Sequence, residues 1–321
     1  MKRLALMIIY YGKKPQYLST FLGSAANNKN IDFLIFSDWD NLPIYTSNII
    51  HHNLPLNKFN EIAKNKKILK KGIIHPYKLC DLKPAWADIL YEFIPESKYD
   101  YFGYIDIDLL LGNIMKILKL VDYKKFDCLN IGKEYLSGAF NILRNTHFYR
   151  TLYKKSVTWE FVFNDSRFFA FDEDFMPHFK DMIIENQIKL KSFHKVICEE
   201  ENLGNLKTKW IDEFVKVERP IYLKYENGNI KDETNKEYLL FNYIRVKHSL
   251  FWIDPLFNKL PSVFFINKHG FYRYKWFPLT YFTIFFHPKQ ICHLLSHLWI
   301  KRIALSRYLN DLIVKKLIVA R

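Results

Sequence analysis

The stretch that decides the fold is residues 101–114, which read YFGYIDIDLLLGNI. Residues 101–105 carry apolar and aromatic side chains around one glycine, a composition typical of a strand buried on both faces of a parallel sheet. Asp106 and Asp108 follow at once. Residues two apart in an extended chain point to the same side. Both carboxylates can therefore bind one metal ion while the neighbouring isoleucines face the core. The stretch predicts a pair of acids at the carboxyl end of a buried strand.

Two aspartates in this position are candidate metal ligands. A buried carboxylate is unfavourable unless a cation or a hydrogen-bond donor compensates it. Two hard oxygen ligands with open coordination positions suit Mg²⁺ or Mn²⁺ better than zinc. Such an ion could hold a nucleoside-diphosphate sugar and offset the charge that grows on a departing diphosphate. Acid-x-acid motifs also occur by chance in solvated loops, but the preceding apolar strand and the following Gly112 favour the metal site.

Strand and helix patterns alternate over the first 130 residues. Strands are predicted at residues 4–10, 31–36, 49–50, 101–105 and 126–131. Helices are predicted after Pro15, from Asn57 to about Lys70, and over residues 78–93. This order of elements predicts an α/β fold with a mixed, mostly parallel central sheet and with ligands at the carboxyl ends of its strands.

The later part of the chain has a different pattern. It predicts a strand at residues 139–143, helices at 146–154 and 174–187, and a hairpin turn at 226–229, which read ENGN. Aromatic residues crowd the region from 251 onward, and an apolar and basic helix is predicted from Lys289 to the end. Such a helix could lie on an anionic membrane surface, or pack on the rest of the chain with a solvated basic face.

Composition narrows the class of protein. Of the 321 residues 49% are hydrophobic, which excludes a disordered chain, and the formal net charge of +15 indicates either an anionic partner or a biased composition. The lysines are spread along the chain rather than gathered in a stripe, so no nucleic-acid partner is predicted. The four cysteines are far apart and predict neither a zinc site nor a disulfide framework, which favours a reducing compartment.

Neither a leader peptide nor a spanning helix is expected from the sequence. Residues 4–11 imitate a signal peptide, but this apolar run is short and no small-residue cleavage site follows it, so we interpret it as the first buried strand. A spanning helix needs about 18 or more consecutive apolar residues, and the chain has no such run.

Four motifs follow one another along the chain. They are KLCDLKPA at residues 78–85, GYIDID at 103–108 with GNI at 112–114, GAFNILRN at 138–145, and FDE at 171–173. With these motifs, residues 1–248 resemble a bacterial, DxD-containing family of GT-A-type glycosyltransferases from surface-polysaccharide (capsule or O-antigen) gene clusters. The resemblance implies a GT-A fold and metal-dependent transfer of a sugar from a nucleotide sugar to a lipid-linked or surface-polysaccharide acceptor. The alternative is a non-catalytic, membrane-associated or nucleic-acid-binding basic protein that retains such a scaffold.

The resemblance also implies a domain organisation and a location. Residues 1–250 would form the catalytic domain, with 1–130 binding the nucleotide sugar and 131–250 binding the acceptor. Residues 251–321 would form a helical extension able to associate with a membrane. The protein would then be cytoplasmic and peripheral at the inner face of the cell membrane.

Several residues would bind the donor in such an enzyme. The base and ribose would lie at Tyr10 and Gly12, where the first strand ends, and Asp38 after the second strand could accept hydrogen bonds from them. All three could equally serve only to end a strand or form a turn. Arg144 could contact the sugar or the diphosphate, or could pair within the fold.

The KLCDLKPA motif would lie near the donor as well. Lys78 and Lys83 could meet a phosphate, and Asp81 could bind the ribose or orient a lysine.

The resemblance makes Asp172 and Glu173 the candidates for the catalytic base. An inverting transferase needs a carboxylate that accepts the proton of the acceptor hydroxyl. An acidic cluster at a helix N-terminus is the competing interpretation of these residues. The resemblance further implies a His after the hairpin, but residues 238–245 contain none, which leaves Arg245, Lys247 or His248 as candidate diphosphate contacts.

Overall fold

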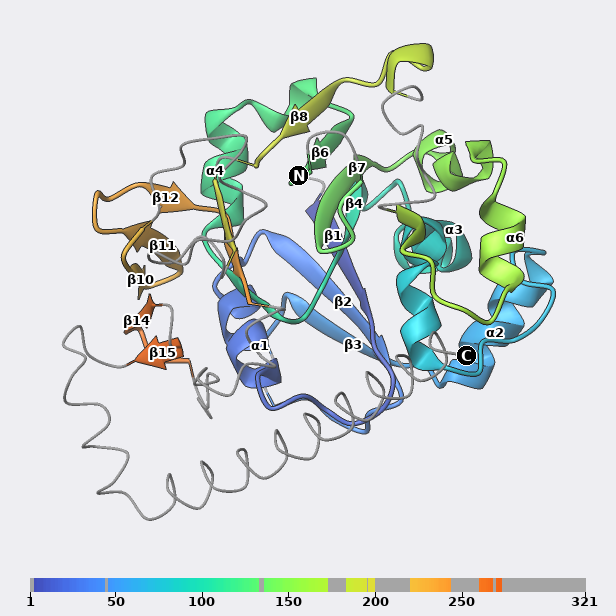
Figure 1. Ribbon diagram of the computed structural model, residues 1–321, viewed down its shortest axis with the longest axis horizontal. Helices are drawn as coiled ribbons and strands as arrows, with labels where there is room; N and C mark the ends of the chain where they lie inside the picture. Colours follow the sequence, from blue (N-terminus) through green and yellow to red (C-terminus); the bar gives the residue numbers. More distant parts are fainter. Residues whose placement is uncertain are drawn as a thin grey trace, which may run out of the picture.

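A seven-stranded sheet forms the centre of the fold, in the order β3-β2-β1-β4-β7-β6-β8 (Figure 1). The computed structural model describes residues 3–43, 46–132, 136–172, 183–194, 196–199, 220–243, 260–267 and 270–272. The central strands are β1 (Arg3–Ile9), β2 (Ile31–Ser37), β3 (Ile49–Asn53), β4 (Tyr99–Ile105), β6 (Cys128–Asn130), β7 (Phe140–Arg144) and β8 (Leu190–Ser192). Neighbouring strands run parallel except at β7, which is antiparallel to β4 and β6. The predicted α/β fold with a mixed, mostly parallel sheet is confirmed.

The strand order reverses between β1 and β4. The chain adds β2 and then β3 on one side of β1, and then places β4 on the other side of β1. In open α/β sheets, ligands bind in the crevice outside the carboxyl ends of the strands at such a reversal. The residues that follow Ile9 and Ile105 lie at this edge.

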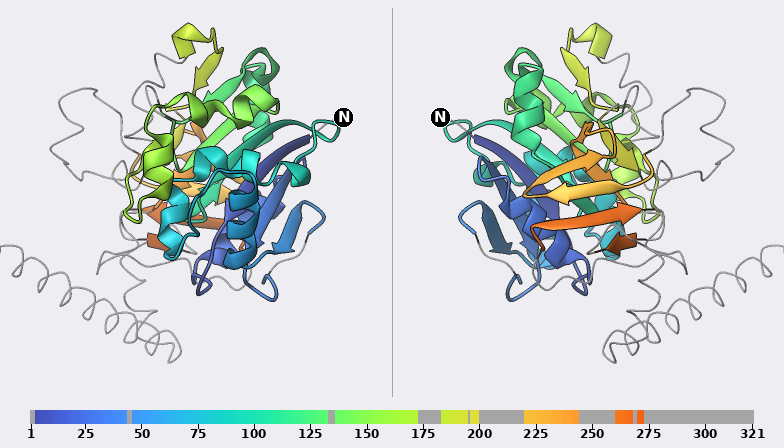
Figure 2. Two further views of the ribbon diagram at one scale, coloured as in Figure 1. Left: turned by 90° about the vertical axis from the view of Figure 1, so that its right-hand side faces the viewer. Right: turned by 90° about the vertical axis from the view of Figure 1, so that its left-hand side faces the viewer.

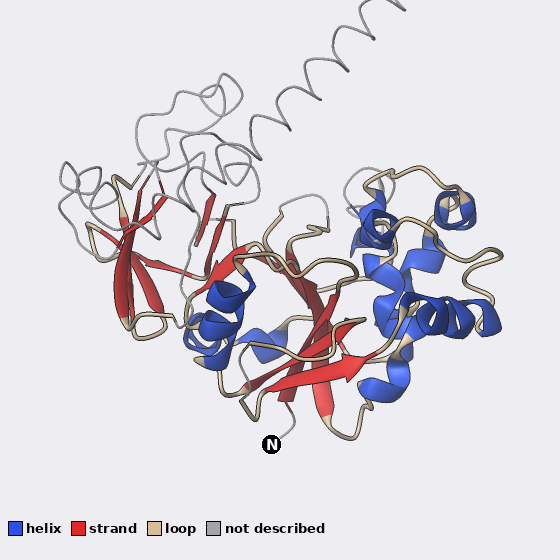
Figure 3. Cartoon of the chain, turned by 90° about the horizontal axis from the view of Figure 1, so that it is seen from below, coloured by secondary structure: helices blue, strands red, loops and turns tan. Residues whose placement is uncertain are grey.

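Helices cover both faces of the central sheet (Figures 1 and 3). One face carries α1 (Leu18–Ala26) and α4 (Ile114–Leu120). The other carries α2 (Leu56–Asn65), α3 (Trp86–Ile89), α5 (His147–Arg150) and α6 (Trp159–Asn164). Residues 4, 6 and 8 of β1 pack in the core on the α1 side, and residues 5, 7 and 9 in the core on the α2 side. Because side chains alternate along a strand, a strand between two helical layers is apolar at every position.

Two smaller sheets adjoin the central one. β13 (Leu240–Asn242) pairs with β5 (Leu109–Leu111) and β9 (Ile197–Glu199). A five-stranded sheet has the order β12-β11-β10-β14-β15, with bounds Glu237–Tyr238, Asn229–Asp232, Leu223–Glu226, Val263–Asn267 and Gly270–Tyr272. Its strands face the viewer in the right-hand view of Figure 2. The predicted hairpin turn joins β10 to β11, with positive φ angles at Asn227 (47°) and Gly228 (86°).

The prediction of one helix over residues 78–93 was wrong. The segment folds as four short helical turns: η1 (Pro76–Cys80), η2 (Lys83–Ala85), α3 and η3 (Tyr91–Phe93). Pro84 lacks a backbone N–H, and its ring collides with the carbonyl group four residues earlier, so an α-helix cannot continue through it. The remaining short turns are η4 (Tyr123–Lys125) and η5 (Leu152–Lys155).

The helix predicted to run from an N-cap at Asn57 to about Lys70 is shorter at its end and begins two residues earlier. Pro55, not Asn57, stands at its N-cap, and α2 ends at Asn65. Lys67 adopts a positive φ of 58°, and the Ile68 amide donates to the Ala63 carbonyl group. This arrangement is a Schellman motif, which ends a helix at a left-handed residue.

The C-terminal prediction is partly corrected. Residues 263–267 and 270–272 form β14 and β15, and β14 pairs with β10, so a domain boundary at residue 250 would divide a sheet. The helix predicted from Lys289 onward, and most of the one predicted at 174–187, lie outside the described residues. Among the described helices, none has the length and apolar character needed to cross a membrane.

Candidate active site

Lys83 joins two segments at the carboxyl edge of the central sheet. Its Nζ atom lies 2.6 Å from Oδ1 of Asp106, the first residue after β4. The same atom lies 2.7 Å from the carbonyl oxygen of Gly138, two residues before β7. The Lys83 side chain is 6% exposed and that of Asp106 is 25% exposed. A buried ammonium group is therefore fixed beside a carboxylate that remains open to solvent.

Asp172 lies at the same place. A Cβ atom built on Gly138 would come within 2.6 Å of Oδ2 of Asp172 and 3.3 Å of Nζ of Lys83. Asp172 is buried, so the absence of a side chain at position 138 leaves space for this carboxylate and the nearby ammonium group. The structure thus brings together Lys83, Asp106 and Asp172, which come from three separate motifs of the sequence.

The charge of Lys83 is maintained by its neighbours. Burial by itself lowers the pKa of a lysine, but the charges of Asp106 and Asp172 and the hydrogen bond to Asp106 outweigh it and raise the pKa of Lys83. The side chain is therefore a permanent cation at neutral pH. Such a cation can stabilise negative charge that a bound substrate carries or develops.

Cys80 is a member of this group that the sequence reasoning missed. Burial, together with the charges of Asp106, Asp172 and Asp81 and against the opposing charge of Lys83, raises the pKa of its thiol to about 12. The group is thus a neutral thiol at physiological pH and not a nucleophilic thiolate. In the sequence, only the position of Cys80 between Lys78 and Asp81 in the KLCDLKPA motif could have indicated that it lies near the site.

Asp108 lies in the link between β4 and β5. Its carbonyl oxygen accepts a hydrogen bond of 3.4 Å from the Tyr243 amide, just beyond β13, and its side chain is buried. The predicted extended geometry does not hold here, because β4 ends at Ile105 and residues 106–108 form a bend. The prediction that the isoleucines face the core is confirmed, since Ile105 and Ile107 are both buried.

The ends of β1 and β2 are joined beside this edge. The Gly12 amide donates to Asp38 Oδ1 at 3.3 Å, and the indole N–H of Trp39 donates to the Gly12 carbonyl oxygen at 2.6 Å. The rings of Tyr10 and Trp39 lie 5.3 Å apart. The structure thus brings Tyr10, Gly12 and Asp38 together as the sequence predicted and adds Trp39, which the sequence reasoning did not single out.

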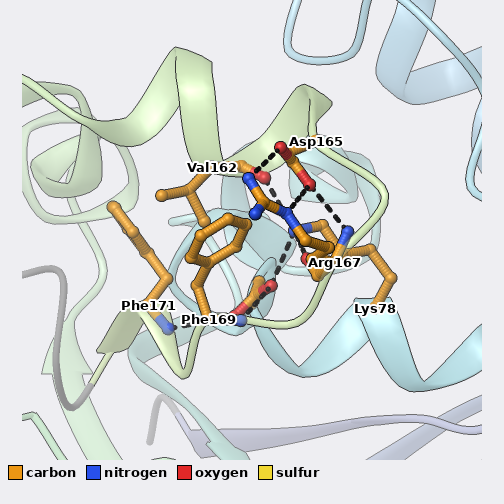
Figure 4. A network of polar contacts seen from close by, with 7 residues as sticks. Lys78, Val162, Asp165, Arg167, Phe169 and Phe171 are labelled. Carbon is orange, nitrogen blue, oxygen red and sulfur yellow. Dashed lines mark hydrogen bonds and ion pairs between the residues drawn. The ribbon is translucent and has the colours of Figure 1, made fainter. Parts of the chain in front are cut away.

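Lys78 and Asp81 are both buried, and Figure 4 shows Lys78 with its partners Val162 and Arg167. The Nζ atom of Lys78 donates to Asp81 Oδ2 at 2.7 Å, to the Val162 carbonyl oxygen at 2.7 Å and to the Arg167 carbonyl oxygen at 2.6 Å. An ammonium group has three protons, and these contacts use all of them. The contacts therefore contradict the prediction that Lys78 meets a phosphate, because no proton is left for one. The side chains of Lys78 and Asp81 are 5% and 0% exposed.

Arg144 does not join the predicted group. It pairs with Tyr101 at the start of β4, whereas Phe140 pairs with Ile105 at the end of β4. At 3.2–3.4 Å per residue, four residues place Arg144 about 13 Å along the sheet from the end of β4. Its guanidinium group donates to Asp127 Oδ1 at 2.8 Å. The alternative of an Arg144 paired within the fold is the correct one.

The remaining predicted site residues, Glu173 and His248, lie outside the described residues, as do Arg245 and Lys247. Within the part of the chain that the structure describes, no three His, Cys, Asp or Glu side chains are grouped so that they could hold a metal ion. Asp106 and Asp108 thus supply at most two such ligands there.

Replacing Gly138 by alanine should disturb this group selectively. The added Cβ would force apart Asp172 and Lys83, and a displacement of about 1 Å in an active site reduces turnover by roughly 10²-fold. Gly72→Ala is the matched control, because its Cβ meets only the Asn60 side chain, at 3.1 Å. Turnover by the two variants should be compared at equal folded fraction, measured by circular dichroism. Equal turnover in Gly138→Ala and wild type would show that Asp172 and Lys83 need not lie together.

The fold and this group define an α/β protein with an acidic, lysine-containing site where the strand order reverses. The chain belongs to a family of unknown function, DUF6625, whose model matches residues 6–273. No protein of curated function matches the sequence.

Three similar solved structures are glycosyltransferases. The galactosyltransferase LgtC, in complex with donor and acceptor sugar analogs, is 13% identical, with a TM-score of 0.42 over 75% of this chain and 87% of its own. Mouse xyloside xylosyltransferase 1 is 9% identical, with a TM-score of 0.36 over 66% and 90%. GlyE from Streptococcus pneumoniae is 11% identical, with a TM-score of 0.31 over 59% and 45%. These likenesses are too distant to assign an activity to this chain.

Proposed function

We propose that this protein is a metal-dependent glycosyltransferase that moves a sugar from a nucleoside-diphosphate sugar to a lipid-linked or surface-polysaccharide acceptor. The observation that carries the proposal is the contact of Lys83 with Asp106 beside Asp172, at the sheet edge where the strand order reverses. This edge is where open α/β sheets bind nucleotides, and a cation beside acids is what a diphosphate with its metal ion requires.

The donor would extend along this edge. Its base and ribose would contact the joined ends of β1 and β2 at Tyr10, Gly12 and Asp38. Its diphosphate would lie toward the end of β4, where Lys83 is a permanent cation. His248 follows Tyr243 by five residues, and the Tyr243 amide bonds to Asp108, so we propose His248 as a further diphosphate contact.

Asp106 and Asp108 fit Mn²⁺ or Mg²⁺ in the chemistry of their donor atoms. Mg²⁺ commonly binds through one or two carboxylates together with substrate phosphates, so two acids without a full protein cage match that pattern. The solvent-open carboxylate of Asp106 could contribute to such a site while Lys83 holds its Oδ1 atom. When bound, the ion supplies positive charge that stabilises the leaving nucleoside diphosphate.

Asp172 would act on the acceptor. In inverting transfer, a carboxylate accepts the proton of the attacking hydroxyl group, and Glu173 directly follows as the second candidate for this role. Lys83 places a positive charge near this carboxylate.

The wider setting is proposed from the sequence. Residues 1–130 would bind the donor, and the acceptor-binding part would continue from residue 131 through β15. The aromatic and basic sequence that follows would bring the enzyme to an anionic membrane surface on its cytoplasmic side. Such a location suits a bacterial enzyme of capsule or O-antigen synthesis, whose acceptor is carried on a lipid.

A donor panel tests the proposed function. The full-length protein, supplied with Mn²⁺ or Mg²⁺, should be thermally stabilised by one class of nucleoside-diphosphate sugar and should slowly hydrolyse it, because a bound ligand stabilises the native state. No stabilisation and no turnover with UDP-, GDP-, ADP- or dTDP-linked sugars would contradict the proposal. Binding of duplex DNA at low salt would instead support the nucleic-acid alternative.

Replacing Asp172 by asparagine should lower sugar transfer by about 10²-fold, the contribution typical of a general base. Binding of the nucleoside diphosphate should change little, because the proposed contact is with the acceptor. The control is Asp122→Asn, a surface aspartate paired with Lys125. Steady-state kinetics with saturating donor measure the effect, and unchanged transfer would move the role of base to Glu173.

A further inference from the structure

The segment that leads into Asp172 is bound to a buried carboxylate from another part of the chain. The amide of Phe169 donates to Asp81 Oδ1 at 3.2 Å and to Oδ2 at 3.1 Å, and the amide of Phe171 donates to Oδ1 at 3.0 Å. Asp81 is fully buried. Two backbone amides on either side of Ala170 thus converge on a single side chain.

Ala170 has the conformation that makes this convergence geometrically feasible. Its φ angle is +51°, in the left-handed region that a residue with a Cβ atom rarely adopts. A left-handed residue between others turns successive amides toward one concave side, and such a backbone nest binds an anion. A strained conformation persists only where the surroundings enforce it, and here the Asp81 carboxylate occupies the nest.

Lys78 completes the same contact from the opposite side. Its ammonium group is bonded to Asp81 and to the carbonyl oxygens of Val162, within α6, and of Arg167, in the loop that follows α6 (Figure 4). The ion pair therefore binds carbonyl groups at 162 and 167 through its cation and amides at 169 and 171 through its anion. The whole segment 162–171 is tied to two residues of the KLCDLKPA motif.

This tie connects the groups of the candidate site. Asp81 stands two residues before Lys83, and Phe171 stands immediately before Asp172. Lys83 and Asp172 thus follow closely on the two partners of one buried contact, and both side chains lie beside Gly138. Any loosening of that contact would separate them.

We infer that Lys78 and Asp81 are positioning residues, a buried ion pair that fixes residues 162–171 and so holds Asp172 beside Lys83. The consequence for catalysis rests on the proposed function, whereas the structural role does not. The inference replaces the expectation that Lys78 and Asp81 bind the donor, because their hydrogen-bonding groups are directed to each other and to the backbone of this segment.

Hydrogen–deuterium exchange of the full-length protein tests the structural role. With single-residue resolution, the amides of Phe169 and Phe171 should be protected in the wild type. In Asp81→Asn they should exchange at least tenfold faster, because the carboxylate acceptor is lost. Exchange in the wild type at the rate of an open chain would overturn the inference outright.

Two further variants isolate the effect. Lys78→Met combined with Asp81→Asn removes both charges, so no unpaired lysine stays buried, and this double variant serves if the single one fails to fold. Asp122→Asn is the matched control, because Asp122 pairs with Lys125 at the same three-residue spacing but at the surface, away from this segment. Protection of Phe169 and Phe171 should fall in the double variant and stay unchanged in the control. Equal loss in the control would overturn the inference.

Kinetics separate positioning from donor binding. In Asp81→Asn, kcat for sugar transfer should fall at least tenfold while the donor KM stays within about threefold of the wild type, because these residues do not touch the donor. A donor KM raised tenfold with unchanged kcat would overturn the inference in favour of donor contact. If the amides of Phe169 and Phe171 are protected but the protein binds no nucleotide, the structural role of the ion pair is supported and the proposed function is contradicted.

A rescue experiment distinguishes positioning from general loss of stability. Glycine adopts positive φ without steric penalty, so Ala170→Gly should let the nest form with less help from Asp81. Adding Ala170→Gly to Asp81→Asn should recover at least threefold of the lost kcat. No recovery, at equal folded fraction, would show that the geometry at Ala170 is not what Asp81 maintains.

Discussion

Replacing Asp106 or Asp108 by asparagine should reduce sugar transfer by on the order of 10³-fold, because several kcal/mol of transition-state stabilisation by a bound cation would be lost. Asparagine keeps the shape of the side chain but removes the charge that holds Mn²⁺ or Mg²⁺. Binding of Mn²⁺ in the presence of a nucleoside diphosphate should weaken in parallel, which calorimetric titration measures. The two variants differ in one respect, since only Asp106 is bonded to Lys83.

The matched control for both variants is Asp100→Asn, an exposed aspartate near the start of the same strand, β4. It should retain full transfer and metal binding. Full activity of the wild type in excess chelator would contradict the assignment of the metal site, even if both aspartates proved essential for another reason.

Replacing Lys83 by methionine should reduce sugar transfer by roughly 10²- to 10³-fold, the effect of removing one preorganised group that stabilises transition-state charge. Methionine preserves much of the apolar stem, so the buried site stays filled. Loss of the ammonium group also leaves Asp106 and Asp172 without their shared cation. Two neighbouring carboxyl groups then resist ionisation, so the acidic limb of the pH–activity profile should move to higher pH.

The control for this variant is Lys66→Met. Lys66 is also largely buried and also donates to carbonyl oxygens, those of Asp88 and Ile89, but these contacts do not include any of the proposed site residues. Transfer by Lys66→Met and its pH profile should match those of the wild type at equal folded fraction. A similar loss in both lysine variants would mean that Lys83 supports the fold rather than the chemistry.

Sequence reasoning succeeded for the strands of the central sheet because burial on both faces requires a continuous run of apolar residues. A strand between two helical layers is apolar at nearly every position, and residues 4–10, 31–36 and 101–105 are such apolar runs. Helix boundaries were less predictable, since one proline divided the segment at 78–93 and one left-handed lysine ended α2.

The candidate site was predictable in part. Asp106, Asp172 and Lys83 were all singled out, but their convergence depends on pairing between distant segments: Lys83 reaches a residue 23 positions away and another 55 positions away. The sequence left open whether Arg144 contacts the donor or pairs within the fold, because the register of β7 against β4, not the motif, decides at which end of the sheet it lies.

The sequence by itself determined the fold class, the acid pair at the end of β4 and the family resemblance, because each is encoded in short-range patterns. Only the tertiary structure decided the roles of the two lysines in one motif. Lys78 and Lys83 are five residues apart and of the same type, yet one is bound to backbone 84 and 89 residues away while the other stands beside Asp106. The partner of a buried charge is set by which distant segment packs against it, and no local pattern records that.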